Sequence, residues 1–417
     1  MNKAESQRIS DYLELIGYQS TPILHNTDMM VLNTCVVRQS AENKVIGMLG
    51  YLKGIKNKKS SLSVIVTGCF VDSDIEQLEK TFPYVDLFFK PGDYDALLNW
   101  AKKQGIGIPN CGACLPLNNE VVVSALVPII QGCNNFCSYC IVPYRRGRET
   151  SRPIEEVVCD VTELVKCGVR EVTLLGQNVN SYGHDLLEKT DLGNLLTELN
   201  YVAGLARIRF LTNHPKDMNR ELIQDLASLD NVCEHINLPL QAGDDDVLKA
   251  MRRGYTVEQY RQLVGVVRDY IPGVALSTDV IVGFPDESEE QFERTLAMLD
   301  EIRFDTVHVA AYSPRPGTIA LRKYEDNVSL DIKKNRLNRV ETLQAKIAGD
   351  INSQLTGKTV EILVEGKKGA KWYGRTRSNK LVFFESNNDC IGRLVDVTIA
   401  RTSPWALQAE MQSLAIK

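Results

Sequence analysis

Residues 132–140 read Gly-Cys-Asn-Asn-Phe-Cys-Ser-Tyr-Cys and bring Cys133, Cys137 and Cys140 into one short stretch. The stretch follows an apolar run that predicts a β-strand ending near Gln131. Three thiols in a loop at the end of a strand are typical of a metal or redox centre. We therefore expect the chemistry of the molecule to be located in this loop.

The number of cysteines in the loop decides which centre it predicts. A four-iron cluster held by Cys133, Cys137 and Cys140 keeps one iron without a protein ligand, open to the amino and carboxylate groups of S-adenosylmethionine (SAM). Electron transfer from that cluster cleaves the sulfonium. Zinc is one alternative, but zinc sites pair C-x2-C units with a fourth Cys or His, and the sequence places none nearby. A cluster completed by a distant fourth cysteine is the other, and it would give electron transfer only.

Alternating strand and helix patterns surround the cysteine loop. Between residues 120 and 350 we expect strands that end near Gln131, Leu175, Phe210, Leu240, Val282 and Ala311, with helices between them. Repeated βα units whose strands run into polar or glycine residues predict a partial (βα)6 barrel with its site on the carboxyl rim. Among the histidines, His214 and His235 are the best placed to face the rim, although a satisfied structural role is favoured for both.

A small parallel α/β domain is predicted for residues 1–104. Strand-like segments at Met29–Asn33 and Leu62–Thr67 run into Cys35 and Cys69, and ligands of such domains gather at the carboxyl ends of the strands. Residues 105–119 then read as a linker rich in Gly, Pro and Asn. The linker holds a Cys-Gly-Ala-Cys pair, for which an incidental role is favoured over metal or redox work; its cysteines are Cys111 and Cys114. Four further cysteines are predicted to be inert buried residues: Cys159, Cys167, Cys233 and Cys390.

Residues 352–417 change to short strands with tight turns, which predicts a small β-barrel. Residues 366–380 hold six cations and no anion around Trp372 and Tyr373. Cations contact phosphates and aromatic rings stack on unpaired bases, so this stretch predicts an RNA platform, with a solvated hairpin as the alternative. A second basic stretch beside the cysteine loop either holds RNA phosphates or pairs with carboxylates: Arg145, Arg146, Arg148 and Arg152.

Composition narrows the remaining classes. The net charge of -5 argues against non-specific coating of nucleic acid, and no apolar run is long enough to cross a membrane. An odd count of 11 cysteines without an export signal disfavours a disulfide framework. We therefore expect a cytoplasmic protein that uses some of its thiols for metal or redox work, without a membrane partner and as a monomer.

Longer motifs extend the pattern over the whole chain. The stretch Cys-Asn-Asn-Phe-Cys-Ser-Tyr-Cys-Ile-Val-Pro-Tyr-Arg-Arg-Gly resembles the methylthiotransferases of the radical SAM enzymes. The resemblance continues in Ser151–Pro153, Leu238–Gly243, Met251–Thr256, Asp279–Pro285 and Tyr312–Thr318. The Leu-Pro-Leu-Gln and Ser-Pro-Arg-Pro-Gly-Thr variants are most similar to the branch that modifies N6-(dimethylallyl)adenosine next to the tRNA anticodon. The C-terminal segment resembles a TRAM domain, which favours tRNA as the partner.

The resemblance implies two [4Fe–4S] clusters and two molecules of SAM. Cys133, Cys137 and Cys140 match the ligands of the SAM-binding cluster, and Cys35 and Cys69 match two of the three ligands of a second cluster. The third belongs to a Cys-Gln-Met-Asn motif, and the sequence starts at its Met-Asn pair. We expect the missing cysteine and the first strand of the domain to lie just upstream.

The implied reaction adds a methylthio group at C2 of the adenine. One SAM methylates sulfur at the second cluster, and the other gives a 5′-deoxyadenosyl radical that removes the C2 hydrogen. We predict that Gly176, Gln177 and Asn178 hold the amino acid end of SAM, with a simple loop as the alternative. Threonylcarbamoyladenosine or a ribosomal-protein aspartate as substrate, and a non-catalytic RNA-binding iron–sulfur protein, are the competing interpretations. The residues identify neither the electron donor nor the sulfur source.

Overall fold

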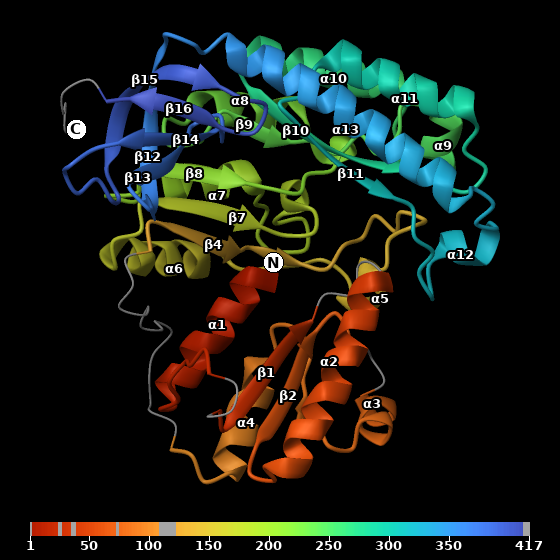
Figure 1. Ribbon diagram of the computed structural model, residues 1–417, viewed down its shortest axis with the longest axis vertical. Coiled ribbons are helices and arrows are strands. Elements are labelled where there is room, and N and C mark those ends of the chain that lie inside the picture. The colour runs from red at the N-terminus through yellow and green to blue at the C-terminus, as the bar shows by residue number, and fades with distance from the viewer. Residues whose placement is uncertain (1, 24–26, 35–38, 72–74, 108–121, 412–417) are drawn as a thin grey trace. The chain divides into compact units, whose positions relative to one another are not determined.

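The computed structural model describes residues 2–23, 27–34, 39–71, 75–107 and 122–411 (Figure 1). The chain divides into two compact units. Unit 1 comprises Met1–Glu120, Gln131–Glu149 and Ser313–Thr318, and unit 2 comprises Val121–Ile130, Thr150–Tyr312 and Ile319–Lys417. Among the described residues, no helix is long and apolar enough to cross a membrane.

Unit 1 is a three-layer α/β domain around a parallel sheet in the order β1-β2-β3, as predicted. Its elements are α1 (Asn2–Leu15), β1 (Met29–Thr34), α2 (Gln39–Lys58), β2 (Ser63–Gly68), α3 (Ile75–Thr81), β3 (Leu87–Phe88), α4 (Tyr94–Lys103) and α5 (Val142–Arg145). Ile65 of β2 packs with α1 and α4, while its neighbour Val66 packs with α2 and α3. Helices therefore cover both faces, which explains why the central strand β2 is apolar on both sides.

Unit 2 contains the predicted βα units, whose parallel strands form the sheets β4-β7-β8 and β9-β10-β11. The strands are β4 (Ser124–Pro128), β5 (Ile130–Gln131), β6 (Thr150–Ser151), β7 (Glu171–Leu175), β8 (Arg207–Phe210), β9 (His235–Asn237), β10 (Ala275–Val282) and β11 (Thr306–Ala311). A parallel bridge between Ile208 and Val232 lies just before β9. The prediction of strand ends is close throughout, and the fourth strand ends slightly earlier than expected, at Asn237.

Helices follow the strands and begin at well-formed caps. They are α6 (Ile154–Lys166), α7 (Leu192–Asn200), α8 (Arg220–Ser228), α9 (Asp245–Ala250), α10 (Val257–Tyr270), α11 (Glu289–Ile302), α12 (Ile319–Lys323) and α13 (Leu330–Ser353), with short 3-10 turns η2 (Val179–Ser181) and η3 (Pro215–Asp217). Thr256 and Ser288 form capping boxes with Gln259 and Gln291 at the starts of α10 and α11. Such caps satisfy the free amide groups of the first helical turn, so these helices start where the sequence directs them.

The C-terminal part of unit 2 is a closed barrel in the order β12-β13-β14-β16-β15. Its strands are β12 (Thr359–Lys368), β13 (Lys371–Thr376), β14 (Leu381–Glu385), β15 (Leu394–Thr402) and β16 (Leu407–Glu410). Gly374 is required in β13, because a Cβ there would lie 2.1 Å from the carbonyl oxygen of Leu363. The predicted barrel is confirmed, and β16 is a strand that the sequence pattern did not reveal.

Candidate functional site: the cysteine loops of unit 1

The loop that carries Cys133, Cys137 and Cys140 closes on itself. The amide of Cys133 donates to the carbonyl of Gly147 at 3.2 Å, and the amide of Cys140 donates to the carbonyl of Cys137 at 3.0 Å. Gly132 makes the closure possible, since a Cβ there would lie 1.9 Å from the carbonyl oxygen of Arg148. The backbone thus holds the three cysteines in one compact turn of chain.

The three thiols of the loop are largely withdrawn from solvent. Cys133 and Cys137 are buried and Cys140 is half-buried. Burial, with the nearby Glu149 and Cys137, raises the pKa of Cys133 to about 11. Among the described residues, no three Cys, His, Asp or Glu side chains form a group that could hold a metal ion.

A second cysteine site begins at the end of β2. Cys69 is buried, and its amide donates to the carbonyl of Thr34 at the end of β1, at 3.0 Å. Gly68 allows this approach, because a Cβ there would lie 2.3 Å from the same carbonyl oxygen. Cys35, Cys111 and Cys114 lie outside the described residues. The structure therefore describes one of the two predicted cysteines of this site, at the strand end where it was expected.

The four cysteines without an assigned role divide evenly. Cys233 and Cys390 are buried, as predicted for small apolar residues. Cys159 on α6 and Cys167 at its end are exposed, so the prediction of burial was wrong for them. Apolar neighbours in the sequence did not predict burial here, because adjacent residues of a helix point to different faces.

The basic stretch beside the cysteine loop is only partly available to RNA. Within unit 1, Arg146 is buried and pairs with Glu5, with 3.1 Å between Nη2 and Oε2. Within unit 2, Arg152 pairs with Asp160 at 2.7 Å. Arg148 is exposed and its guanidinium lies over the Phe136 ring at 4.7 Å. The alternative considered for this stretch, pairing with carboxylates of the barrel, is therefore confirmed for Arg152, whereas Arg146 pairs with a carboxylate of α1.

Candidate functional site: the two ends of the unit 2 barrel

The loop after β7 lies at the carboxyl rim of the unit 2 strands. Gly176 packs closely on Ile130, whose Cγ2 would stand 2.3 Å from a Cβ at this position. Asn178 is buried, and its side-chain amide donates to Asp217 at 2.7 Å. Its Oδ1 has no hydrogen-bond partner. An orphaned buried acceptor costs free energy unless a ligand satisfies it, so the position of this atom is compatible with the predicted SAM contact.

Three further residues at the carboxyl rim share this property. Asn213 Oδ1, His214 Nε2 and Gln241 Oε1 are buried polar atoms without a partner. Thr212 and Gln241 also have positive φ angles, 71° and 69°, which non-glycine residues rarely adopt. Strained backbone and unsatisfied polar groups occur together at binding sites. The sequence showed polar residues after these strands but not which of them would be left without a partner.

The two buried histidines occupy opposite ends of the strands. His214 follows β8, and burial together with Arg253 and Lys216 lowers its pKa to about 2. His235 opens β9 at the amino end, and burial lowers its pKa to about 3. The expectation that His235 faces the rim was wrong, and neither histidine is fully satisfied, since His235 Nδ1 also lacks a partner.

The C-terminal barrel packs against the amino ends of the unit 2 strands. Arg209 of β8 pairs with Glu171 at 2.9 Å and donates to the carbonyls of Thr376 and Arg377, both at 2.7 Å. Arg207, fully buried, donates to the carbonyl of Arg375 at 2.6 Å. These bonds fix the turn between β13 and β14 against the start of the barrel strands.

The contacts between the C-terminal barrel and the unit 2 strands also involve cations of the predicted RNA platform, which are then not available to RNA. Arg377 pairs with Glu234 at 2.7 Å, and Lys380 with Asp305 at 2.6 Å. Trp372 is buried in the C-terminal barrel and donates from Nε1 to the carbonyl of Ser386 at 3.1 Å, so the prediction that it stacks on unpaired bases was wrong. Lys367 and Lys368 lie at the end of β12, next to the turn into β13, and their side chains are exposed.

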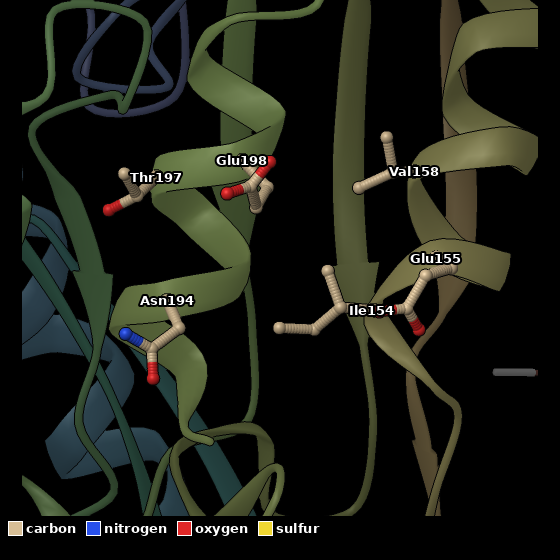
Figure 2. A pocket seen from close by; sticks show the side chains of 6 residues that line it. All are labelled: Ile154, Glu155, Val158, Asn194, Thr197 and Glu198. Carbon is tan, nitrogen blue, oxygen red and sulfur yellow. The ribbon is translucent and has the colours of Figure 1, made fainter. Parts of the chain in front are cut away.

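A surface pocket of about 420 Å³ lies between α6 and α7 (Figure 2). It is lined by Ile154, Glu155, Val158, Asn194, Thr197 and Glu198. The pocket is on the helical layer, away from the strand ends, and none of its lining side chains carries an unsatisfied buried polar atom. It has no feature that indicates chemistry.

Three family models each match a different segment of the chain. Residues 127–299 match the radical SAM superfamily, residues 1–90 the uncharacterized protein family UPF0004, and residues 353–411 the TRAM domain. In fold, the chain is similar to the radical S-adenosylmethionine methyltransferase TsrM from Kitasatospora setae, with a TM-score of 0.52 and 18% identity over 74% of this chain and 67% of that one.

Full-length relatives are considerably closer in sequence. The tRNA-2-methylthio-N(6)-dimethylallyladenosine synthase of Dehalococcoides mccartyi (strain CBDB1) is 49% identical over 99% of this chain and 96% of its own length. The synthase of the same name from Herpetosiphon aurantiacus is 43% identical over 100% of this chain and 96% of its own length. The chain therefore belongs to the tRNA-2-methylthio-N(6)-dimethylallyladenosine synthases, a family of radical SAM methylthiotransferases.

Proposed function

We propose that the chain adds a methylthio group to C2 of N6-(dimethylallyl)adenosine next to the anticodon of tRNA. The observation that carries the proposal is the compact loop of Cys133, Cys137 and Cys140 in a chain whose full-length relatives are named for this reaction. The C2–H bond of adenine is neither acidic nor electrophilic enough for side-chain acid–base chemistry, which agrees with the lack of any predicted catalytic dyad.

Cys133, Cys137 and Cys140 would hold the SAM-binding [4Fe–4S] cluster. When bound, the cluster supplies the electron that cleaves SAM to a 5′-deoxyadenosyl radical, which removes hydrogen from C2. Gly176, Gln177 and Asn178 orient the amino acid end of SAM, and the unpaired Oδ1 of Asn178 is suited to accept from its ammonium group.

The buried acceptors Asn213 and Gln241 at the carboxyl rim would accept hydrogen bonds from the amine or hydroxyl groups of the nucleosides that bind there. Burial of these side chains keeps water away from the ligand, which protects a radical from side reactions. His214 stays neutral at working pH because burial lowers its pKa to about 2, so it positions a ligand and does not transfer a proton from an imidazolium.

A second [4Fe–4S] cluster would be bound by Cys35 and Cys69 with a third cysteine. The fit rests on Cys69, whose buried thiol lies at the end of β2 and accepts a hydrogen bond from Arg146. This cluster would carry the sulfur that one SAM methylates.

We assign the parts of the chain as follows: residues 1–104 hold the second cluster, residues 105–119 link it to the radical SAM region at residues 120–350, and residues 352–417 bind tRNA. The exposed cations Lys367 and Lys368 support the last assignment. A monomer acting on tRNA in the cytoplasm is the simplest arrangement. The electron donor and the sulfur source are separate partners.

Anaerobic reconstitution tests the proposal. The chain is assayed for iron, labile sulfide, SAM cleavage and methylthioadenosine in isopentenylated tRNA. We expect both SAM cleavage and methylthio product. Cleavage without product would contradict the methylthiotransferase function. Binding of tRNA without cleavage would instead support the non-catalytic alternative.

A further inference from the structure

His214 follows β8 in unit 2 and is held in place by contacts on several sides. Its backbone forms a reciprocal pair with the Asn180 side chain: the amide donates to Oδ1 and the carbonyl accepts from Nδ2, both at 2.9 Å. The imidazole lies edge-on to the Tyr255 ring, with 5.8 Å between the ring centroids. His214 is only 4% exposed. The protein itself therefore fixes the position of the imidazole.

The contacts of His214 also decide which ring nitrogen carries the proton. Nδ1 accepts a hydrogen bond from the backbone amide of Lys216 at 3.3 Å, so Nδ1 itself carries no hydrogen. Burial, together with the cations Arg253 and Lys216, lowers the pKa of His214 to about 2, which keeps the ring neutral. The single ring proton of a neutral imidazole then lies on Nε2. Nε2 is thus a hydrogen-bond donor.

This donor is buried and has no partner among the described residues. An unmade hydrogen bond of a buried N–H costs free energy, which a bound acceptor recovers. Two acceptors in the same situation lie at the same rim, Oδ1 of Asn213 and Oε1 of Gln241. Tyr255 connects His214 to the second of them, because its hydroxyl donates to the carbonyl of Leu240 at 2.9 Å. This part of the rim therefore offers a ligand one donor beside two acceptors.

A dimethylallyl-substituted adenine presents the complementary groups. Its ring nitrogens N1 and N3 accept hydrogen bonds, and the remaining N6–H donates one. Since C2 lies between N1 and N3, a donor to either nitrogen fixes the direction in which the C2–H bond points. A neutral donor suits a neutral ring nitrogen, whereas carboxylates are usually bound by cations. Proteins commonly recognise an unpaired base through hydrogen bonds to such edges.

We propose that His214 is a substrate-binding residue whose Nε2–H donates to N1 or N3 of the target adenine and so orients the C2–H bond for the radical. The inference rests on the substrate given under the proposed function. Asn213 and Gln241 accept from the N6–H or from a ribose hydroxyl, which prevents the base from binding in the flipped orientation. The radical then meets C2 rather than another edge of the ring.

Two substitutions separate the ligand contact of His214 from its contact within the protein. His214→Asn keeps an acceptor for the amide of Lys216 but has no donor at the position of Nε2. His214→Gln keeps a donor near that position but loses the acceptor beside Lys216. We expect His214→Gln to bind substrate RNA more tightly than His214→Asn, whereas a purely structural histidine predicts the reverse order. His308→Asn, at an exposed position of β11, is the matched control and should leave binding unchanged.

The binding partner is an anticodon stem-loop RNA that carries N6-(dimethylallyl)adenine as the target base. Its affinity for the anaerobically reconstituted chain is measured by fluorescence anisotropy, with SAM present and without a reductant. The same RNA is prepared with the 1-deaza or the 3-deaza base, in which C–H replaces N1 or N3. We expect His214→Asn to lose about 2- to 10-fold in affinity for the normal RNA. One deaza RNA should show a similar loss with the wild-type chain, and His214→Asn should then add no further loss.

The outcomes distinguish this inference from the proposed function. If His214→Asn weakens all three RNAs by the same factor, or weakens only SAM binding, the contact with a ring nitrogen is overturned and the function stands. If the wild-type chain does not prefer the dimethylallyl RNA to unmodified RNA, both are overturned. Should His214→Asn fail to fold, the wild-type chain decides: a loss with one deaza RNA supports the proposal, and equal affinity for all three RNAs rejects it.

Discussion

The two ends of the barrel strands in unit 2 differ in what meets their buried polar groups. At the amino end, Arg209 has a partner for each of its guanidinium nitrogens, namely Glu171 and the carbonyls of Thr376 and Arg377. Unsatisfied buried atoms occur at both ends, on Arg207 and His235 at the amino end and on Asn213, His214 and Gln241 at the carboxyl rim. The C-terminal barrel contacts the amino end, and we expect the carboxyl rim to contact a bound ligand instead.

The contrast explains why a charged residue in the same strand does not by itself mark a site. Arg207 and Arg209 of β8 are buried cations beside the centre of an enzyme, yet they hold the C-terminal barrel in place. Two residues beyond the end of β8, Thr212 adopts a strained φ of 71° next to unsatisfied groups. Since Arg207 Nε also lacks a partner, the carboxyl rim is distinguished by unsatisfied groups that occur together with a strained backbone, and not by either feature or by charge alone.

Arg209→Met should produce the largest loss of stability. The substitution leaves buried Glu171 and the carbonyls of Thr376 and Arg377 without their donor, which costs about 3–5 kcal/mol. Urea unfolding would measure the loss, and limited proteolysis would report earlier release of the C-terminal barrel. Arg261→Met, which breaks an exposed ion pair with Glu301, is the control and should cost under about 1 kcal/mol. Equal losses of unfolding free energy in the two variants would show that Arg209 does not hold the C-terminal barrel in place.

The buried histidines should make stability depend on pH. Burial lowers the pKa of His214 to about 2 and that of His235 to about 3, so the unfolded chain binds their protons first as pH falls. Stability is therefore present above the unfolded pKa and falls below it, by about 1.4 kcal/mol per pH unit for each histidine. Unfolding free energies at pH 7 and pH 5 would show the slope. His214→Asn and His235→Asn should each reduce it, and an unchanged slope in both would refute this explanation.

Gln241→Met should weaken ligand binding without destabilising the fold. Its Oε1 has no partner among the described residues, so its loss removes about 1–3 kcal/mol from a bound ligand, roughly 5- to 150-fold in affinity. Anaerobic calorimetry with SAM and kinetics with tRNA would show which ligand is affected. Gln224→Met on α8 is the matched control, because the side-chain amide of Gln224 donates to the Tyr270 hydroxyl at an exposed position away from the strand ends. A clear loss of thermal stability with unchanged affinities would show that Gln241 is a structural residue.

Removing the exposed cations of the C-terminal barrel should have the smallest effect. The double substitution of Lys367 and Lys368 by Ala should weaken tRNA binding a few-fold and reduce the salt dependence by about 0.7–0.9 per lost phosphate contact. Filter binding between about 50 and 200 mM salt measures both. Alanine at the exposed Lys334 and Lys346 of α13 provides a control with the same change in charge. If the control weakens binding equally, the barrel does not provide the specific surface.

The sequence predicted the order of the βα units and the position of the cysteine loop, because both depend on local patterns. Apolar runs ending in polar residues identify parallel strands, and the close spacing of Cys133, Cys137 and Cys140 does not depend on the rest of the fold. The strand β16 was missed because it has only four residues, although these alternate in burial and pair with β15 across the turn at residues 403–406.

Partners that are distant in sequence could not be predicted in the same way. Arg146 and Trp372 both occur in stretches whose composition indicates RNA binding. Arg146 nevertheless pairs with Glu5, which is distant in the sequence, and Trp372 is buried in the core of the C-terminal barrel. The unsatisfied atoms of Asn213 and Gln241 likewise depend on which groups the fold fails to bring near them. Composition describes what a residue is able to do, and tertiary contacts decide whether it remains available.

Hydrogen–deuterium exchange of the anaerobically reconstituted chain, with and without SAM, tests the contrast between the two ends most directly. The account predicts slower exchange at residues 176–180, 212–214 and 239–243 of the carboxyl rim when SAM is bound. It predicts no change at residues 376–380, which the amino end already holds through Arg207 and Arg209. Protection of residues 376–380 by SAM, or unchanged exchange at the carboxyl rim, would contradict it.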